Sequence, residues 1–257
     1  MPYSIGHNLR ISVRRLRRDP LFSVLAIFCL ALAIGANTAV FSVLKAVVLA
    51  PLPFPDADHL QTTPTIFTGA NRDDQEYLAT PDAYAEMRQA RSFTSLAAIW
   101  EGEMDLTEEG AEPERVRAAW VTPDLFRLLG TRPLLGRTLQ AGDERPGSGD
   151  PAVIDEGLWR RRYGADPGLV GRAILVDGRP RTVVGVIPSR AGYPLAAELW
   201  TPFDPDTMSG GLRRMGFLMT VGRLADGADP GAAQEEMDAV AARLADLTAG
   251  RSVAGRW

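Results

Sequence analysis

The pattern of hydrophobic and polar residues divides the chain near residue 50. From Leu21 to Leu44 there are 24 consecutive residues without Asp, Glu, Lys or Arg. At a rise of about 1.5 Å per residue, a helix over this run is about 36 Å long, enough to cross a hydrocarbon core of about 30 Å. The pattern predicts a transmembrane helix over residues 21–50 and a separate outer domain over residues 51–257.

The residues before this run predict the orientation of the helix. Residues 1–20 contain five arginines and one acidic residue, whereas after Lys45, at the end of the run, no lysine or arginine follows until Arg72. Basic residues stay on the cytoplasmic side of a membrane, so the amino terminus is predicted to be cytoplasmic and residues 51–257 extracytoplasmic. A cleaved signal peptide is the alternative, but Pro51 directly follows the nearest small-residue site, which ends at Ala50, and disfavours cleavage.

The arginine-rich segment has a helical pattern of its own. Four apolar residues recur at helical spacing, with arginines on another face: Ile5, Leu9, Val13 and Leu16. This predicts a basic amphipathic helix over residues 1–20 on an anionic inner membrane surface. The alternative is that the arginines only set the topology.

The outer domain alternates between strand and helix patterns. Thr-Pro-Asp at positions 80–82 and again at 122–124 predicts two helix starts, with the threonine as N-cap in each. Two strands are predicted around a polar turn at 108–114, and Asp177-Gly178 predicts a hairpin. A helix follows residue 229. Because strands and helices interleave without strict alternation, the predicted fold class is α+β.

Charge and composition exclude several functions. The net charge is −4, and residues 46–257 alone carry −9, because residues 1–20 contribute +4 and Lys45 contributes +1. Such an acidic domain repels nucleic acid. The single cysteine, Cys29, lies within the apolar run, and the two histidines, His7 and His59, are predicted on opposite sides of the membrane. We therefore predict no disulfide, no metal site and no cofactor.

Small and hydroxylated residues form a stripe along the predicted transmembrane helix. Such a stripe lets another helix approach closely, and its hydroxyl groups can form hydrogen bonds across the contact. The predicted interface is with further permease spans or with a second copy of this helix, through Ala31, Gly35, Asn37, Thr38 and Ser42. Small residues are also simply common in membrane helices, which is the alternative.

Three stretches together resemble one family. They are the basic lead, the apolar "ALAIGANTAVFSV", and the exit "PLPFPDADHL". This sequence is similar to the opening of MacB-like ABC transporter permeases, in particular the large duplicated permeases of acidobacteria. The continuation, including "VTPDLFRLLGTRPLLGRTL" and "RAILVDGRPRTVVGVIP", resembles the family's periplasmic core domain.

The resemblance implies an extracytoplasmic domain of two α+β lobes on a bacterial inner-membrane permease. It also implies further spans after residue 257, so we interpret the sequence as a fragment or a truncated gene product. The only lysine, Lys45, is followed by Ala46 and cannot serve a Walker A loop. A separate ATPase subunit is therefore an expected partner. The substrate cannot be read from the sequence.

Two other classes of function are alternatives. A membrane-anchored binding or adaptor module without transport fits a chain of this length nearly as well. An extracytoplasmic enzyme would need paired carboxylates. The available ones lie in Gly- or Pro-rich turns, where carboxylates are normally solvated, so we predict no catalysis by Glu108, Glu109, Glu112, Glu114, Asp143 or Glu144.

Overall fold

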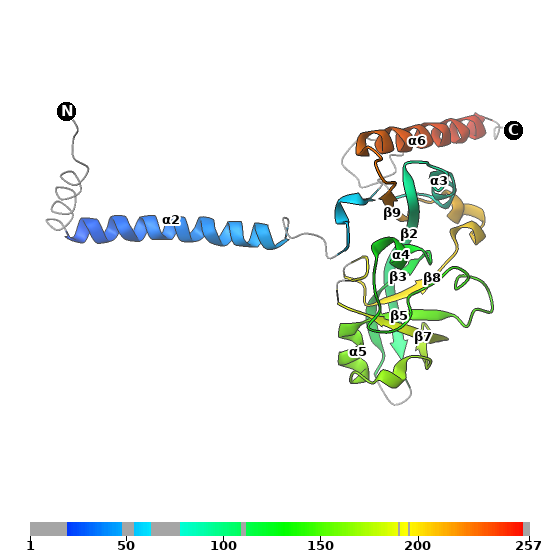
Figure 1. The fold of residues 1–257 in the computed structure, drawn as a ribbon, viewed down its shortest axis with the longest axis horizontal. Helices are drawn as coiled ribbons and strands as arrows, with labels where there is room; N and C mark the ends of the chain where they lie inside the picture. The colour runs from blue at the N-terminus through cyan, green and yellow to red at the C-terminus, as the bar shows by residue number, and fades with distance from the viewer. Residues whose placement is uncertain are drawn as a thin grey trace. The chain divides into compact units, whose positions relative to one another are not determined.

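The structure is a computed structural model that describes residues 20–47, 54–62, 78–108, 112–189, 191–194 and 196–253. Two compact units, Met1–Leu52 and Pro53–Trp257, make up the chain. We describe each unit by itself (Figure 1). The amphipathic helix predicted over residues 1–20 lies outside the described residues, apart from Pro20.

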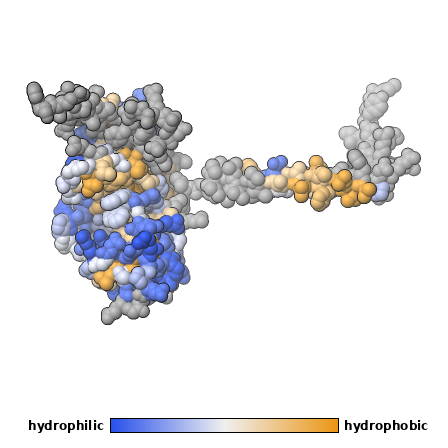
Figure 2. Space-filling view, turned by 180° about the vertical axis from the view of Figure 1, so that it is seen from behind, coloured by the Kyte–Doolittle hydropathy of each residue, from blue (hydrophilic) through white to orange (hydrophobic). Residues whose placement is uncertain are grey.

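The first unit contains one long helix, α2 (Pro20–Val47), which is continuous through Gly35. Its described apolar side chains are exposed, from 58% at Ile34 to 85% at Leu21, and they form the orange stretch of the helix in Figure 2. Within the part of the chain that the structure describes, no helix has both the length and the apolar character to cross a membrane.

The second unit is built on a nine-stranded mixed sheet. Eight strands follow the order β1-β9-β2-β3-β8-β5-β7-β4, and β6 pairs with both β2 and β7. The strands are β1 (Leu60–Thr62), β2 (Phe93–Thr107), β3 (Glu114–Val121), β4 (Leu135–Gly136), β5 (Pro151–Asp155), β6 (Ala173–Val176), β7 (Arg179–Ile187), β8 (Leu199–Pro202) and β9 (Met219–Leu224).

Helices lie at both ends of this unit. Figure 1 shows α3 and α6 at one end and α5 at the other. The helices are α3 (Pro81–Met87), α4 (Leu125–Leu129), α5 (Glu156–Tyr163) and α6 (Pro230–Val253), with short 3-10 turns η1 (Ala57–His59), η2 (Pro167–Leu169), η3 (Pro205–Thr207) and η4 (Gly210–Arg214). The α+β class predicted from the sequence is confirmed.

Six of the strands close into a ring. Strands β2, β3, β8, β5, β7 and β6 each pair with the next, and β6 pairs back with β2 through Leu106↔Val176. A cluster of buried apolar residues belongs to this ring, including Met104, Ile154 and Leu199. We call these six strands the ring. Because β2 has 15 residues, its first half extends beyond the ring.

That first half of β2 contributes to two other cores. Ala97 and Ile99 join a cluster with α4 and Trp200. Leu96 and Ala98 point to the opposite face and join a cluster with residues of α3 and α6 and with Leu218, which directly precedes β9. We call α3, α6 and this last cluster the helical end.

Most predicted element boundaries are confirmed. Thr80 caps α3, its hydroxyl oxygen accepting from the Ala83 N–H at 3.0 Å, with Pro81 at the first helical position. Helices α4 and α5 both end at a glycine in the left-handed conformation, Gly130 and Gly164. Asp177 and Gly178 have φ of 49° and 71° and join β6 to β7.

The second predicted N-cap, Thr122, is wrong. Helix α4 begins at Leu125 with Asp124 as its N-cap, and the Thr122 hydroxyl oxygen accepts instead from the Ala98 N–H at 3.1 Å. The backbone N–H of Thr122 also donates to the Ala98 carbonyl. Thr122 directly follows β3 and extends the β2–β3 pairing. Its hydroxyl oxygen accepts a hydrogen bond from Ala98 of β2 and therefore does not cap α4.

Candidate functional site

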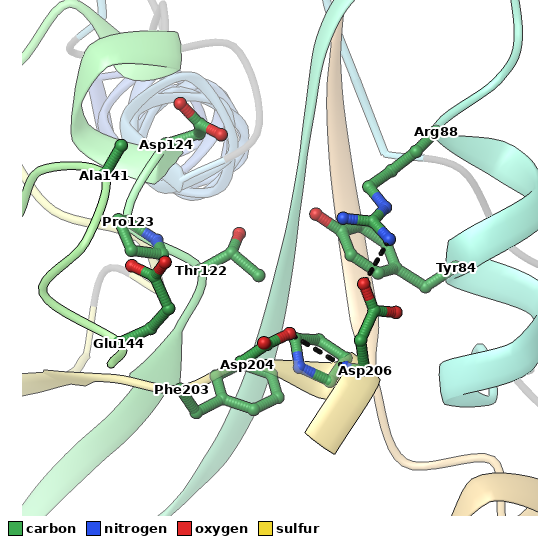
Figure 3. A pocket seen from close by; sticks show the side chains of 11 residues that line it. Tyr84, Arg88, Thr122, Pro123, Asp124, Ala141, Glu144, Phe203, Asp204 and Asp206 are labelled. Carbon is green, nitrogen blue, oxygen red and sulfur yellow. Dashed lines mark hydrogen bonds and ion pairs between the residues drawn. The ribbon is translucent and has the colours of Figure 1, made fainter. Parts of the chain in front are cut away.

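The candidate site is a pocket of about 190 Å³ in the second unit (Figure 3). Four segments form it: α3, the turn before α4, the loop around residue 141, and the turn after β8. The lining residues are Tyr84, Arg88, Thr122, Pro123, Asp124, Ala141, Glu144, Phe203, Asp204, Pro205 and Asp206.

The inner wall of the pocket is buried and hydrogen-bonded to the protein. The Tyr84 hydroxyl donates to the Leu96 carbonyl at 3.1 Å, and a further hydrogen bond joins it to the Thr122 hydroxyl. Burial raises the pKa of Tyr84 to about 12. The phenol is therefore neutral at physiological pH, and both hydroxyls serve to hold α3 against β2 and β3.

The outer wall carries the charges. Arg88 donates to Asp206 at 2.6 Å, and Asp204 accepts from the Asp206 backbone N–H at 2.9 Å. Glu144 faces this pair from the opposite side of the pocket in Figure 3 and accepts from the Gly142 N–H. With Asp124, the lining holds four carboxylates and one guanidinium. Such a lining attracts a positively charged group and repels phosphate.

Sequence reasoning missed part of this pocket. Thr122, Asp124 and Glu144 had been singled out, but Tyr84, Arg88 and Asp206 had not. A signal is present in "TPFDPD", residues 201–206, where threonine, proline and aspartate cluster for a third time. Nothing in the sequence indicated that this turn and α3 would meet.

The carboxylates considered for an enzyme have other partners. Glu114 binds Arg161 at 2.7 Å and Arg162 at 2.9 Å, and these hydrogen bonds lower its pKa. Asp143 binds Arg137 at 2.6 Å with a side chain that is 10% exposed.

The remaining carboxylates of that set are spread over the surface. Glu108 lies 3.8 Å from Arg172, and Glu112 is exposed. Glu109 lies outside the described residues. Glu144 alone lines the pocket. In the described part of the chain, no three His, Cys, Asp or Glu side chains are placed to hold a metal ion together.

The predicted interface residues lie on α2. Ala31, Gly35, Asn37 and Thr38 are exposed in the first unit, and apart from the adjacent backbone of α2 and the residues next to Gly35, no described atom lies within 4 Å of where a Cβ on Gly35 would be. The Thr38 hydroxyl donates to the Ile34 carbonyl at 2.8 Å, and the hydroxyl oxygen can still accept a hydrogen bond. Ser42 belongs to the same helix, but its side chain is outside the described set. The interface stays a prediction.

Comparisons with known proteins agree on one fold. The chain resembles the periplasmic region of MacB from Actinobacillus actinomycetemcomitans, with 15% identity and a TM-score of 0.56 over 77% of this chain and 93% of that one. It also resembles a domain of a putative permease from Porphyromonas gingivalis, with 16% identity, a TM-score of 0.51 and coverage of 71% and 82%.

A third similar structure is the extracellular domain of a transporter. The extracellular domain of the noncanonic ABC-type transporter YknZ from Gram-positive bacteria matches with 16% identity and a TM-score of 0.51, over 74% of this chain and 93% of that domain. No curated protein sequence matches the chain. The model of the MacB-like periplasmic core domain matches residues 23–240. That match covers most of the sequence, so the chain belongs to the family of MacB-like periplasmic core domains.

Proposed function

We propose that this chain is a permease-type subunit, or a fragment of one, in a MacB-like ABC transporter, and that its outer domain couples ATP-driven motion to an extracytoplasmic substrate or partner. The observation that carries the proposal is the family match over residues 23–240. The fold supports a mechanical role, because one 15-residue strand, β2, belongs both to the ring and to the helical end.

Membrane anchoring by residues 21–50 is part of this proposal. It rests on the full sequence of the uncharged run from Leu21 to Leu44, including side chains outside the described set. The exposure of Leu21, Phe28 and Ile34 on a single helix supports it, because exposed apolar side chains in such number are stable only in an apolar environment or against other helices. The proposed site is a bacterial inner membrane, with the amino terminus in the cytoplasm.

The outer domain is proposed to have no catalytic role of its own and to need no cofactor. Energy comes from a separate ATPase subunit, since the only lysine, Lys45, lacks the Walker A context. The chain and this ATPase should purify together from detergent extracts of the native membrane. Full ATPase activity of that subunit after deletion of this chain would contradict the coupling role.

A membrane-anchored binding module is the second candidate. It is favoured by a partly exposed aromatic cluster in the second unit: Trp100 stacks on Trp120 with ring centroids 4.6 Å apart, and Phe217 packs edge-on against Trp100. Trp100 is 37% exposed, and Met215, two residues before Phe217 in the sequence, is 57% exposed. Such a surface fits a binding partner. An adaptor, unlike a permease subunit, would leave the rate of ATP hydrolysis unchanged when it is removed.

The topology can be tested directly. We expect Ser148→Cys in a Cys29→Ser background to react with a membrane-impermeant maleimide in intact spheroplasts, because Ser148 lies in an exposed loop of the outer domain. A Ser4→Cys variant in the same background is the matched cytoplasmic control and should react only after lysis. Labelling of both positions only after lysis would refute the proposed orientation.

The helix stripe has its own test. We expect Gly35→Leu or Thr38→Leu to weaken association of the helix, each by about 0.6–2 kcal/mol, because both remove close approach or a hydrogen bond between helices. Leu32→Ala on another face is the control. Disulfide crosslinking at stripe positions, with and without the other permease spans, measures the association. Equal crosslinking in stripe and control variants would show that the stripe is not an interface.

A further inference from the structure

The attachment of α6 to the rest of the second unit is narrow. Among its described side chains, at positions 230–240 and 242–243, three are buried: Ala233, Met237 and Val240. They are spaced four and three residues apart and so lie on one face of the helix. Met237 and Val240 join the apolar cluster of the helical end. One of the three is an alanine, which contributes little apolar area.

One polar contact supplements this face. The Glu236 carboxylate accepts from two successive backbone N–H groups, Arg91 at 2.9 Å and Ser92 at 3.0 Å, one with each oxygen. The Ser92 side chain also hydrogen-bonds to it. Charge-assisted hydrogen bonds of this kind are about twice as strong as neutral ones. Glu236 is therefore the main polar link between α6 and the connection from α3 to β2.

This contact lies at a junction of three elements. Ser92 directly precedes β2, and its carbonyl accepts from the Ala225 N–H at the end of β9. By binding at Ser92, the Glu236 carboxylate therefore links α6 to the start of β2 and, through Ser92, to the end of β9. Any displacement of α6 must first break the Glu236 contact or move β2.

The chemistry of the contact makes it reversible. When Glu236 leaves, the two N–H groups face solvent and water replaces the carboxylate, so no buried polar group is stranded. Among the described side chains of α6, the apolar face then opposes release, and it belongs to the cluster that includes Met87 and Leu218. Elements with few buried apolar contacts open locally before the whole domain unfolds.

We propose that α6 docks and undocks as a unit on α3 and the start of β2, and that the contact of Glu236 with the Arg91 and Ser92 N–H groups, which we call the latch, sets this equilibrium. The inference concerns the domain itself and holds for either of the functions proposed above. Docked, α6 is tied to β2; undocked, it moves independently of the sheet. Glu236 acts here as a positioning residue.

Hydrogen exchange on the full-length chain in detergent tests the proposal. We expect Glu236→Ala to speed exchange about tenfold in peptides covering residues 88–96 and 230–243, because the latch is lost while the apolar face remains. Exchange in β5 and β7 should not change. Glu235→Ala is the matched control, since Glu235 is exposed on the same helix, and it should leave all of these peptides unchanged.

A second measurement separates opening of α6 from general destabilisation. In a Cys29→Ser background, Met237→Cys reports exposure of the docked face and Val153→Cys reports exposure in the ring. We expect Glu236→Ala to raise the thiol labelling rate about tenfold at position 237 and not at 153. Unchanged exchange and labelling at α6, equal effects of Glu235→Ala and Glu236→Ala, or an equal rise at position 153 would each overturn the proposal.

Discussion

The ring and the helical end of the second unit are held together in different ways. In the ring, every strand has a partner on both sides, and α5 adds a network in which Arg161 and Arg162 bind Glu114, with Arg162 only 9% exposed. At the helical end, α3 is tied by ion pairs that are about 34–44% exposed, Arg88–Asp206 and Arg213–Asp82. Exposed pairs of this kind contribute little.

This difference predicts where the domain is rigid and where it yields. A closed ring with a buried core opens only when many contacts break together, so it should unfold as one cooperative unit. Helix α6, held by a small apolar face and one carboxylate, can rearrange while the ring stays intact. A domain that transmits motion needs both kinds of region, joined by a stiff element, and β2 connects them here.

The largest expected effect comes from the ring core. Leu199→Ala removes a side chain that is completely buried between β3 and β5, and we expect a loss of about 3 kcal/mol in the free energy of unfolding. Exchange should rise in all strands of the ring together. Val240→Ala at the helical end is the counterpart, with a loss near 1 kcal/mol and faster exchange confined to α6 and α3. Chemical denaturation measures the two losses of stability, and hydrogen exchange shows which elements open. If exchange rose over the same elements in both variants, the ring and the helical end would not differ in cooperativity.

The α5 network gives an effect of intermediate size that depends on pH. Glu114→Gln leaves Arg162 nearly buried with its charge unmatched, so we expect a loss of about 2 kcal/mol at neutral pH. Hydrogen bonds from Arg161, above all, lower the pKa of Glu114 in the folded state. The contribution of ionised Glu114 to the free energy of unfolding is therefore complete above the usual glutamate pKa of about 4.3. It is lost as the pH falls through the lowered pKa of Glu114 in the folded state.

The pH profile of stability checks this directly. Wild-type protein and Glu114→Gln should differ at pH 7 and converge as the pH drops below about 4. Glu103→Gln is the control, because Glu103 is exposed and 3.9 Å from its nearest arginine, and it should follow the wild-type profile. A constant difference between wild type and Glu114→Gln over the whole range would show that ionisation of Glu114 does not stabilise the ring.

Local sequence signals predicted elements of both the ring and the helical end, but not how elements distant in the sequence meet. The Asp177-Gly178 hairpin and the β2–β3 pair are contacts between neighbours in the chain, so turn chemistry and alternation were enough. Closure of the ring by β6 against β2 joins residues about 70 positions apart, and no local pattern encodes it. The pocket was missed for the same reason, since its walls come from α3 and from residues 203–206.

The smallest expected difference, about 1 kcal/mol, separates the threonines of two identical tripeptides. At Thr80 the hydroxyl caps the first turn of α3, so Thr80→Ala should cost about 1 kcal/mol and fray only that helix. At Thr122 the hydroxyl receives the Ala98 N–H between two strands, and both Thr122 and Ala98 are buried. Thr122→Val keeps the shape of the side chain but leaves the Ala98 N–H without its acceptor, so the loss in the free energy of unfolding should be nearer to about 2 kcal/mol and should appear in β2 and β3.

Thr122→Ser retains the hydroxyl and is the control. Hydrogen exchange at Ala98 resolves the two roles: faster exchange there in Thr122→Val but not in Thr80→Ala or Thr122→Ser is the expected result. If Thr122→Val instead frayed α4 and left Ala98 protected, Thr122 would be acting as the helix cap that its sequence first suggested.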